Sequence, residues 1–267
     1  MTGTRRQGTE FLLPLCGNLS IRMRQSRSTF CPLSSALCFL ASIFCLLPSA
    51  FAAAQPASIE ASYDLYKEGM KVGQIEETYT RDHGRYTLSS LTTPTGLMAA
   101  FKPGKIFINS NGLIGKSGLQ PLRFSYQREG ATSKDRQAEF DWDAKQLTLI
   151  NQTQRTTLAL PDGTQDRLSA MYQFMFLPLK GGTTLDFPMT NGSKLDHYHY
   201  AIARDQKLKT PAGEFKTLYL DNRAKAGESR TEIWLATQRN NLPCKMIITD
   251  ADGGRITQVL SKLTIKP

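Results

Sequence analysis

The chain has 267 residues and a formal net charge of +10, from 33 lysines and arginines and 23 aspartates and glutamates. The basic residues are scattered and form no cluster of the kind that binds nucleic acid, so we expect no nucleic-acid partner. Three histidines leave little room for triad catalysis, and the sequence contains no phosphate-binding loop, nucleophile elbow or cysteine cluster.

Residues 1–52 have the features of a secretory signal. Arginines between positions 5 and 27 precede an apolar run from Pro32 to Pro48, and Ser49–Ala52 places alanines where signal peptidase reads the chain. We predict cleavage near Ala52 and an exported, periplasmic protein with one domain, residues 53–267; Met23 is an alternative start. The apolar run is shorter than the roughly 20 residues of a spanning helix, so a retained membrane anchor is the less favoured alternative.

Four of the five cysteines fall within this leader, and only Cys244 remains. The mature chain can therefore form no intramolecular disulfide and must rely on an apolar core. Because Cys244 lies in an apolar stretch, we interpret it as a buried small side chain rather than a reactive thiol. Without the leader, 28 basic and 22 acidic residues give a net charge of +6, which favours solubility and allows weak peripheral contact with anionic membranes.

Alternation of apolar and polar residues predicts antiparallel strands through most of the domain. In the first half of the domain, Leu97, Met98 and Phe101 fit one or two turns of helix between strands, as a plug for the core or the lip of a cavity. The strands predicted there are residues 59–66, 72–80, 85–91, 105–110, 122–127, 136–142 and 146–151.

A single amphipathic helix interrupts the strands. Leu168, Met171, Tyr172 and Met175 recur at i, i+3, i+4 and i+7, Thr164 or Asp162 can cap the segment, and Pro178 ends it. A lone helix in a sheet-rich chain most economically covers the open or concave side of the sheet.

The last part of the domain is predicted to be sheet again. Strands are expected at residues 198–203 and 205–210, followed by a four-stranded meander over Phe215–Ile265 in which Asp252–Gly253 supplies the positive φ angles of a primed hairpin turn. The predicted fold class is therefore mainly β: a single curved antiparallel sheet, or a partly closed barrel of meanders, with one covering helix.

Two histidines flank Tyr198, and strand geometry puts His197 and His199 on one face, as a metal site needs. The third histidine, His83, is distant in sequence, so a structural or solvated role is favoured. We predict no metal, no cofactor and no catalytic residue.

Asp166 and Arg167 open the predicted helix and allow three interpretations: surface charges in a first helical turn, a buried pair with Glu232 or Arg230, or a polar grip on a ligand. Trp234 shares a strand face with Arg230 and Glu232, which suggests either the rim of a groove or amphipathic packing.

Several stretches in combination resemble one family. They are Tyr63–Tyr66 with Gly69 and Lys71–Gly73, Gln165–Ser169, Thr210–Leu220, Arg230–Ala236, Leu242–Pro243 and Thr249–Gly253. Together they are similar to the bacterial exported family called domain of unknown function 3108, over nearly the whole mature chain. The resemblance implies an exported, mostly antiparallel β protein without an established activity, so no catalytic residue is carried over. A likeness to curved-sheet lipoprotein carriers is an analogy of fold alone.

We therefore expect an exported periplasmic or envelope-associated binding protein that holds an apolar or amphipathic ligand, such as a lipid, between sheet and helix. An envelope protein is a second possible partner. The alternatives are a carboxylate-dependent enzyme acting on a cell-envelope substrate through Asp166, Glu232 and Arg230, and a scaffold that binds proteins by a sheet edge. The expected ligand-binding residues are Asp166, Arg167, Leu168, Met171, Tyr172, Met175, Arg230, Glu232 and Trp234.

Overall fold

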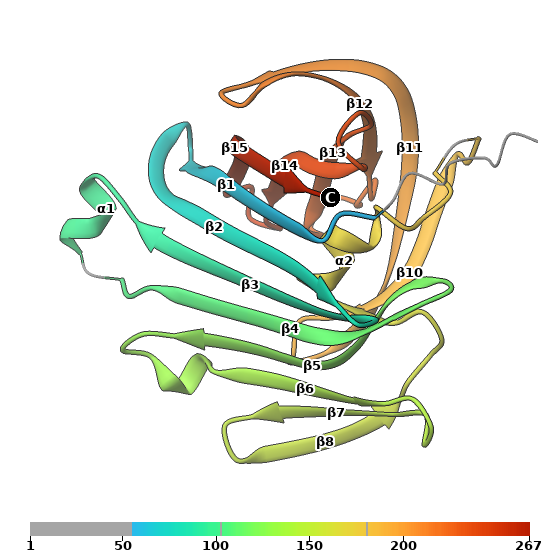
Figure 1. Cartoon of the computed structure of the whole chain (residues 1–267). Coiled ribbons are helices and arrows are strands. Elements are labelled where there is room, and N and C mark those ends of the chain that lie inside the picture. Colours follow the sequence, from blue (N-terminus) through green and yellow to red (C-terminus); the bar gives the residue numbers. More distant parts are fainter. Residues whose placement is uncertain (1–54, 102, 180) are drawn as a thin grey trace, which may run out of the picture. The chain divides into compact units, whose positions relative to one another are not determined.

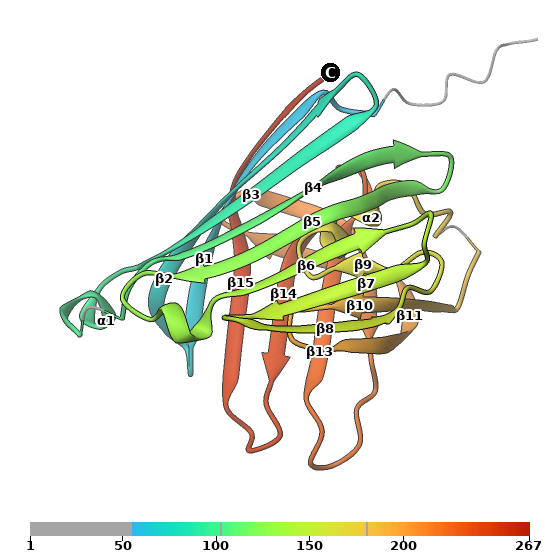
Figure 2. The same cartoon turned by 90° about the horizontal axis from the view of Figure 1, so that it is seen from below.

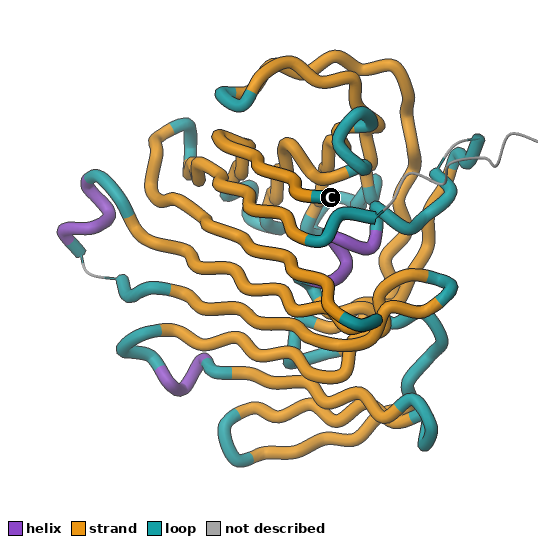
Figure 3. The backbone as a smooth tube through the Cα atoms, in the orientation of Figure 1, coloured by secondary structure: helices purple, strands orange, loops and turns teal. Residues whose placement is uncertain are grey.

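The alternating segments form sheet throughout the part of the chain that the structure, a computed structural model, describes: residues 55–101, 103–179 and 181–267. The leader predicted for residues 1–52 lies outside these ranges. Within them, strands dominate and the helical segments are short (Figure 3). No helix in these ranges is long and apolar enough to cross a membrane.

The strands of the described ranges follow one another with three short helical segments between them (Figure 1). Their bounds are β1 (Ser58–Lys67), β2 (Met70–Asp82), β3 (Arg85–Pro94), α1 (Leu97–Ala100), β4 (Ile106–Gly115), β5 (Gly118–Arg128), η1 (Thr132–Lys134), β6 (Arg136–Asp141), β7 (Gln146–Asn151), β8 (Gln154–Ala159), β9 (Gln165–Asp166), α2 (Ser169–Gln173), β10 (Thr184–Thr190), β11 (Leu195–Thr210), β12 (Gly213–Asp221), β13 (Arg230–Ala236), β14 (Leu242–Thr249) and β15 (Arg255–Lys266).

All the described strands belong to one sheet of 15 strands, in the order β8-β7-β6-β5-β4-β3-β2-β1-β15-β14-β13-β12-β11-β10-β9. Consecutive strands are therefore neighbours in the sheet, except β8 and β9, which lie at its two edges. The two runs of strands are joined where β1 pairs with β15, from Ser58 opposite Lys266 to Lys67 opposite Ile256. Every ladder is antiparallel except the short one between β9 and β10. The predicted class, mainly β with a single curved antiparallel sheet, is confirmed, and the sheet is not closed.

The sheet curves around α2, so that β1–β8 and β10–β15 lie on opposite sides of it (Figures 1 and 2). Two clusters of buried side chains meet at this helix. Leu168, Tyr172 and Met175 pack with residues of β1 to β7, and Phe174 packs with residues of β11, β12 and β13. The segment from Leu168 to Met175 therefore packs against both runs of strands and fills the space between them.

This helix is much shorter than its sequence pattern predicts. It spans Ser169–Gln173 and has no side-chain cap at Leu168, so the predicted caps by Thr164 or Asp162 are wrong. Thr164 donates instead to the carbonyl of Pro161, at 2.6 Å. The apolar side chains still share one direction because the turns that flank the helix continue its curvature, with the N–H of Met175 donating to the carbonyl of Tyr172.

Four strand assignments also differ from the sequence pattern. β8, β9 and β10 were not predicted, with β9 at Gln165–Asp166 where the helix was expected to begin, and β11 runs through residues 195–210 where two strands were expected. In the 250–254 turn, Gly253 has a φ of 88° but Asp252 keeps a negative φ, so the predicted primed turn is wrong. The N–H of Asp250 donates to the carbonyl of Gly254, which makes this a longer hairpin loop.

Candidate ligand-binding site

The turn that leads from β9 into α2 is held by one buried carboxylate. Asp166 accepts hydrogen bonds from the backbone N–H groups of Leu168, at 2.9 Å, and Ser169, at 2.8 Å, and from the hydroxyl of Ser110 on β4, at 2.5 Å. The hydroxyl of Tyr86 lies 3.1 Å from that of Ser110. Burial raises the pKa of Asp166, and these donors oppose the rise. We call Tyr86, Ser110, Asp166 and Ser169 the anchor.

The side chain of the next residue, Arg167, points away from the anchor and lines a cavity. Its backbone N–H donates to the carbonyl of Thr190, at 3.0 Å, while its guanidinium forms no hydrogen bond or ion pair with any residue that the structure describes. The side chain is exposed to solvent, yet loss of bulk water lowers the pKa of the guanidinium. Both statements hold because the side chain projects into a hollow inside the curved sheet, where water reaches it but protein surrounds it.

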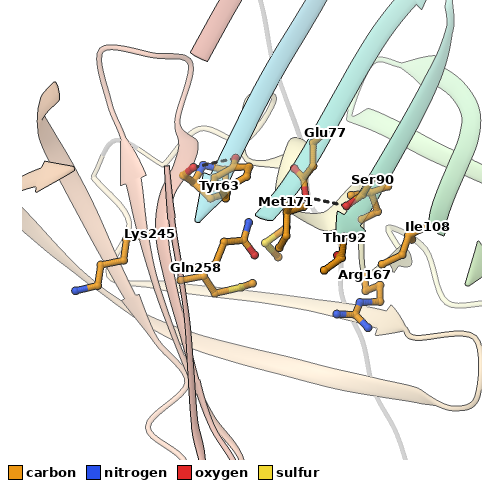
Figure 4. Close-up of a pocket in the computed structure, with 13 residues that line it drawn as sticks. Tyr63, Glu77, Ser90, Thr92, Ile108, Arg167, Met171, Lys245 and Gln258 are labelled. Atoms are coloured by element: carbon orange, nitrogen blue, oxygen red, sulfur yellow. Dashed lines mark hydrogen bonds between the residues drawn. The ribbon is translucent and has the colours of Figure 1, made fainter. Parts of the chain in front are cut away.

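The inner part of this hollow is a cavity of about 90 Å³ between α2 and the strands. Figure 4 shows Glu77 of β2 and Ser90 and Thr92 of β3 lining one side of it, with Arg167 below them. On the other side, the hydroxyl of Tyr63 donates to the carbonyl of Pro243, at 3.2 Å. The inner cavity is therefore lined by a mixture of polar and apolar groups.

Glu77 is the buried acid of the inner cavity, and its side chain is 9% exposed. Tyr172 donates a hydrogen bond to one carboxylate oxygen, at 3.1 Å, and Ser90 to the other, at 3.4 Å. Burial raises its pKa to about 7, because the loss of water outweighs these donors and the nearby charge of Arg167. Near neutral pH the carboxyl is thus divided between its protonated and ionised forms.

The outer part of the hollow is a cavity of about 860 Å³ that shares Arg167, Met171 and Met246 with the inner one. The shared residues show that the two cavities meet beside α2. Its apolar lining comes from both sides of the hollow and consists of Met171, Met189, Tyr198, Tyr200, Met246 and Ile248.

Around the outer cavity, Lys194, Asp196 and His199 are in ion pairs, whereas Arg223 and Lys225 form none within the described ranges. Lys194 lies 2.6 Å from Asp196, His199 pairs with Asp186, and the carboxylate of Glu228 accepts the backbone N–H of Lys225. Among the residues that the structure describes, no group of three or more His, Cys, Asp or Glu side chains could hold a metal ion.

The structure divides the predicted site residues into those at the hollow and those away from it. Arg167, Leu168 and Met171 line the cavities. Asp166, Tyr172 and Met175 are buried beside them, in the anchor and the core.

Arg230, Glu232 and Trp234 line neither cavity. They lie on the face of β13 opposite to the buried Ile233 and Leu235. Arg230 binds Asp221, at 2.7 Å, and Glu232 accepts the Tyr219 hydroxyl, at 2.6 Å, while Lys245 lies over the Trp234 ring. The predicted pairing of Asp166 or Arg167 with Glu232 or Arg230 is therefore wrong, because the two groups lie on different faces of the sheet.

Glu77 and Ser90 were not predicted as site residues, although one signal was available. In β2, Ile75, Glu77 and Tyr79 alternate with polar residues and so must share the buried face. A carboxylate on an otherwise apolar strand face is costly unless it is hydrogen-bonded or functional, and that conflict marks Glu77.

Comparison with known proteins gives the family but no activity. No curated protein matches the chain. Similar solved structures include a β-barrel-like protein of domain of unknown function DUF1849 from Brucella abortus, with 13% identity, 79% of this chain and 99% of that chain covered, and a TM-score of 0.44. Another is a provisionally named exported protein with a YmcC-like fold from Bacteroides fragilis, with 12% identity, 79% and 96% covered, and a TM-score of 0.33. The model of the family described as protein of unknown function (DUF3108) matches residues 62–261, and the chain belongs to this family.

Proposed function

We propose that this protein is an exported, non-enzymatic binding protein that holds an apolar or amphipathic small molecule in the hollow beside α2. The observation that supports it is the pair of joined cavities, of which the outer one, at about 860 Å³, has the size of sites for small organic ligands. Met171, Tyr198 and Met246 offer apolar surface there, and thioether side chains adapt to ligands of varied shape.

The enzyme alternative receives less support. Of the carboxylates that it would use, Asp166 is held by three donors within the anchor, and Glu232 lies outside both cavities. Glu77 is a further acid in the inner cavity, but both of its oxygens already accept hydrogen bonds from Tyr172 and Ser90.

Ligand uptake can be tested by filling the cavity. Met246→Trp places a bulky ring where the two cavities meet, and Met70→Trp makes the same change at a side chain that is 66% exposed and lines neither cavity. We expect the unaltered protein and Met70→Trp to bind a fluorescent hydrophobic probe, and Met246→Trp to bind it much more weakly with an unchanged circular dichroism spectrum. Native mass spectrometry of protein purified from its producing cells should show a co-purified small molecule. Unaltered protein that is empty and takes up no probe would refute the proposal.

Export is tested separately. The full chain, leader included, is expressed in a bacterial host, and the fractionated cells should yield a shortened protein in the periplasm whose N-terminus lies near Ala53. Uncleaved protein in the cytoplasm would contradict the export part of the proposal and leave the binding part standing.

A further inference from the structure

Arg167 is a cation that forms no ion pair with any residue that the structure describes. The groups that act on its charge are Tyr126, Tyr198, Glu77 and Arg136. Glu77 is the carboxylate among them, and it lies beyond ion-pair distance and accepts hydrogen bonds from Tyr172 and Ser90 instead. Removing a cation from bulk water without pairing it is unfavourable, so such a group is retained where it has a role. A guanidinium offers a planar fork of donors that matches a carboxylate or a phosphate.

The position of Arg167 is fixed on both sides. The preceding residue, Asp166, is held within the anchor, the following N–H of Leu168 donates to that carboxylate, and the N–H of Arg167 itself is bonded to Thr190. The backbone of Arg167 therefore needs no further ordering when a ligand arrives, so that only the side chain has to be fixed on binding.

The residues beside Arg167 define what else the ligand must contain. Met171 and Met246 border both cavities, and the outer cavity continues over Tyr198, Tyr200 and Ile248. A molecule that reaches Arg167 from outside thus lies along apolar surface with its remaining length. This arrangement suits a charged head and an apolar chain in one molecule.

We propose that the ligand is an anionic amphiphile, whose carboxylate or phosphate head binds the guanidinium of Arg167 where the two cavities meet and whose apolar chain lies in the outer cavity. The inference rests on the proposed binding function and names its ligand class. Glu77 faces the same head, so its ionised form would repel the ligand.

The test compares probes that share a twelve-carbon chain: dodecyl phosphate, dodecanoate and dodecanol, with inorganic phosphate as a head without a chain. Titrations are made below the critical micelle concentration and at pH 6, where Glu77, with a pKa of about 7, is mostly protonated. We expect both anionic amphiphiles to bind about 10- to 100-fold more tightly than dodecanol, as one charge-assisted interaction allows. Inorganic phosphate should bind far more weakly than dodecyl phosphate.

Variants assign the preference to one residue. Arg167→Gln should lose the preference for the anionic probes while still binding dodecanol, and Arg167→Lys should keep part of that preference. Arg81→Gln is the matched control, because Arg81 is an exposed arginine of β2 that lines neither cavity and should leave the preference unchanged.

The outcomes separate the two proposals. Equal binding of all three twelve-carbon probes would overturn the anionic head, and a preference that survives in Arg167→Gln would overturn its placement at Arg167. Either result would leave the binding function intact. Failure of every twelve-carbon probe to bind would refute the binding function itself. Binding of inorganic phosphate as tight as that of dodecyl phosphate would overturn the amphiphile in favour of a free anion.

Discussion

Asp166 and Arg167 are adjacent in the chain, yet their side chains enter opposite surroundings. In the anchor, the carboxylate of Asp166 meets three donors and is fully buried. In the hollow, the guanidinium of Arg167 and the carboxyl of Glu77 keep charge that the protein only partly compensates. Buried polar groups with all their partners fix one conformation, whereas groups left open are where a ligand can add interactions.

The comparison predicts that a substitution in the anchor lowers the free energy of unfolding the most. Asp166→Ala removes the acceptor of three buried donors, and we expect it to lower the free energy of unfolding by about 3 to 5 kcal/mol, measured by urea denaturation. Asp162→Ala, at an exposed acid paired with Lys145, should change it by less than about 0.5 kcal/mol. Equal effects of the two substitutions would show that the anchor does not hold the turn.

Glu77 should make stability depend on pH. Its folded pKa of about 7 lies above the ordinary value of 4.5, so the folded protein keeps a proton that the unfolded chain releases. The free energy of unfolding should therefore fall by about 3 kcal/mol as the pH rises from 4.5 to 7, and stay lower above pH 7. In Glu77→Gln this fall should disappear from urea unfolding curves, while Glu76→Gln, at the exposed neighbour, should retain it.

A smaller effect is expected on the outer face of β13. Arg230→Ala removes hydrogen bonds to Asp221 from a side chain that is 44% exposed, and we expect a loss of about 1 kcal/mol or less. Probe binding should not change, because Arg230 lines neither cavity. A weakened affinity for dodecyl phosphate in this variant would show that the ligand binds on the outer face of β13 and not in the cavities.

The smallest effect on stability is expected where the proposed effect on binding is greatest. Arg167→Gln removes no ion pair or hydrogen bond within the described ranges, so the free energy of unfolding should change by about 0.5 kcal/mol or less. Since the charge of Arg167 lowers the pKa of Glu77, the substitution should raise that pKa and shift the pH-dependent fall to higher pH. A loss as large as that of Asp166→Ala would mean that Arg167 is structural.

The sequence predicts the strands well wherever one face of a strand is buried. Alternation locates β1 to β7 because each has this pattern, whereas β8, Gln154–Ala159, is almost wholly exposed at the sheet edge and gives no such signal. The sequence pattern did not predict β10 because Phe187-Pro188 is typical of a turn. The strand tolerates Pro188 because β9 pairs only with Met189 and Thr190, which leaves the proline beside an unpaired edge.

The site was harder to predict than the fold. The helical periodicity correctly brings Leu168 and Met171 to the hollow, but it extends over turns and so overestimates the helix. Whether Asp166 or Arg167 is satisfied depends on Ser110, 56 residues away, and on the curvature of the sheet, which local pattern does not specify. The volume of the hollow depends on the same curvature.

The pairing of β1 with β15 has a consequence for biosynthesis. The two strands are the first and the last of the sheet along the chain, and β1 finds that partner only when residues up to Lys266 have been made. Until then the two runs of strands can form separately but have no ladder between them, and closing so long a segment is slow. In the export proposed above, this delay would give translocation machinery that accepts only unfolded polypeptide time to bind the chain.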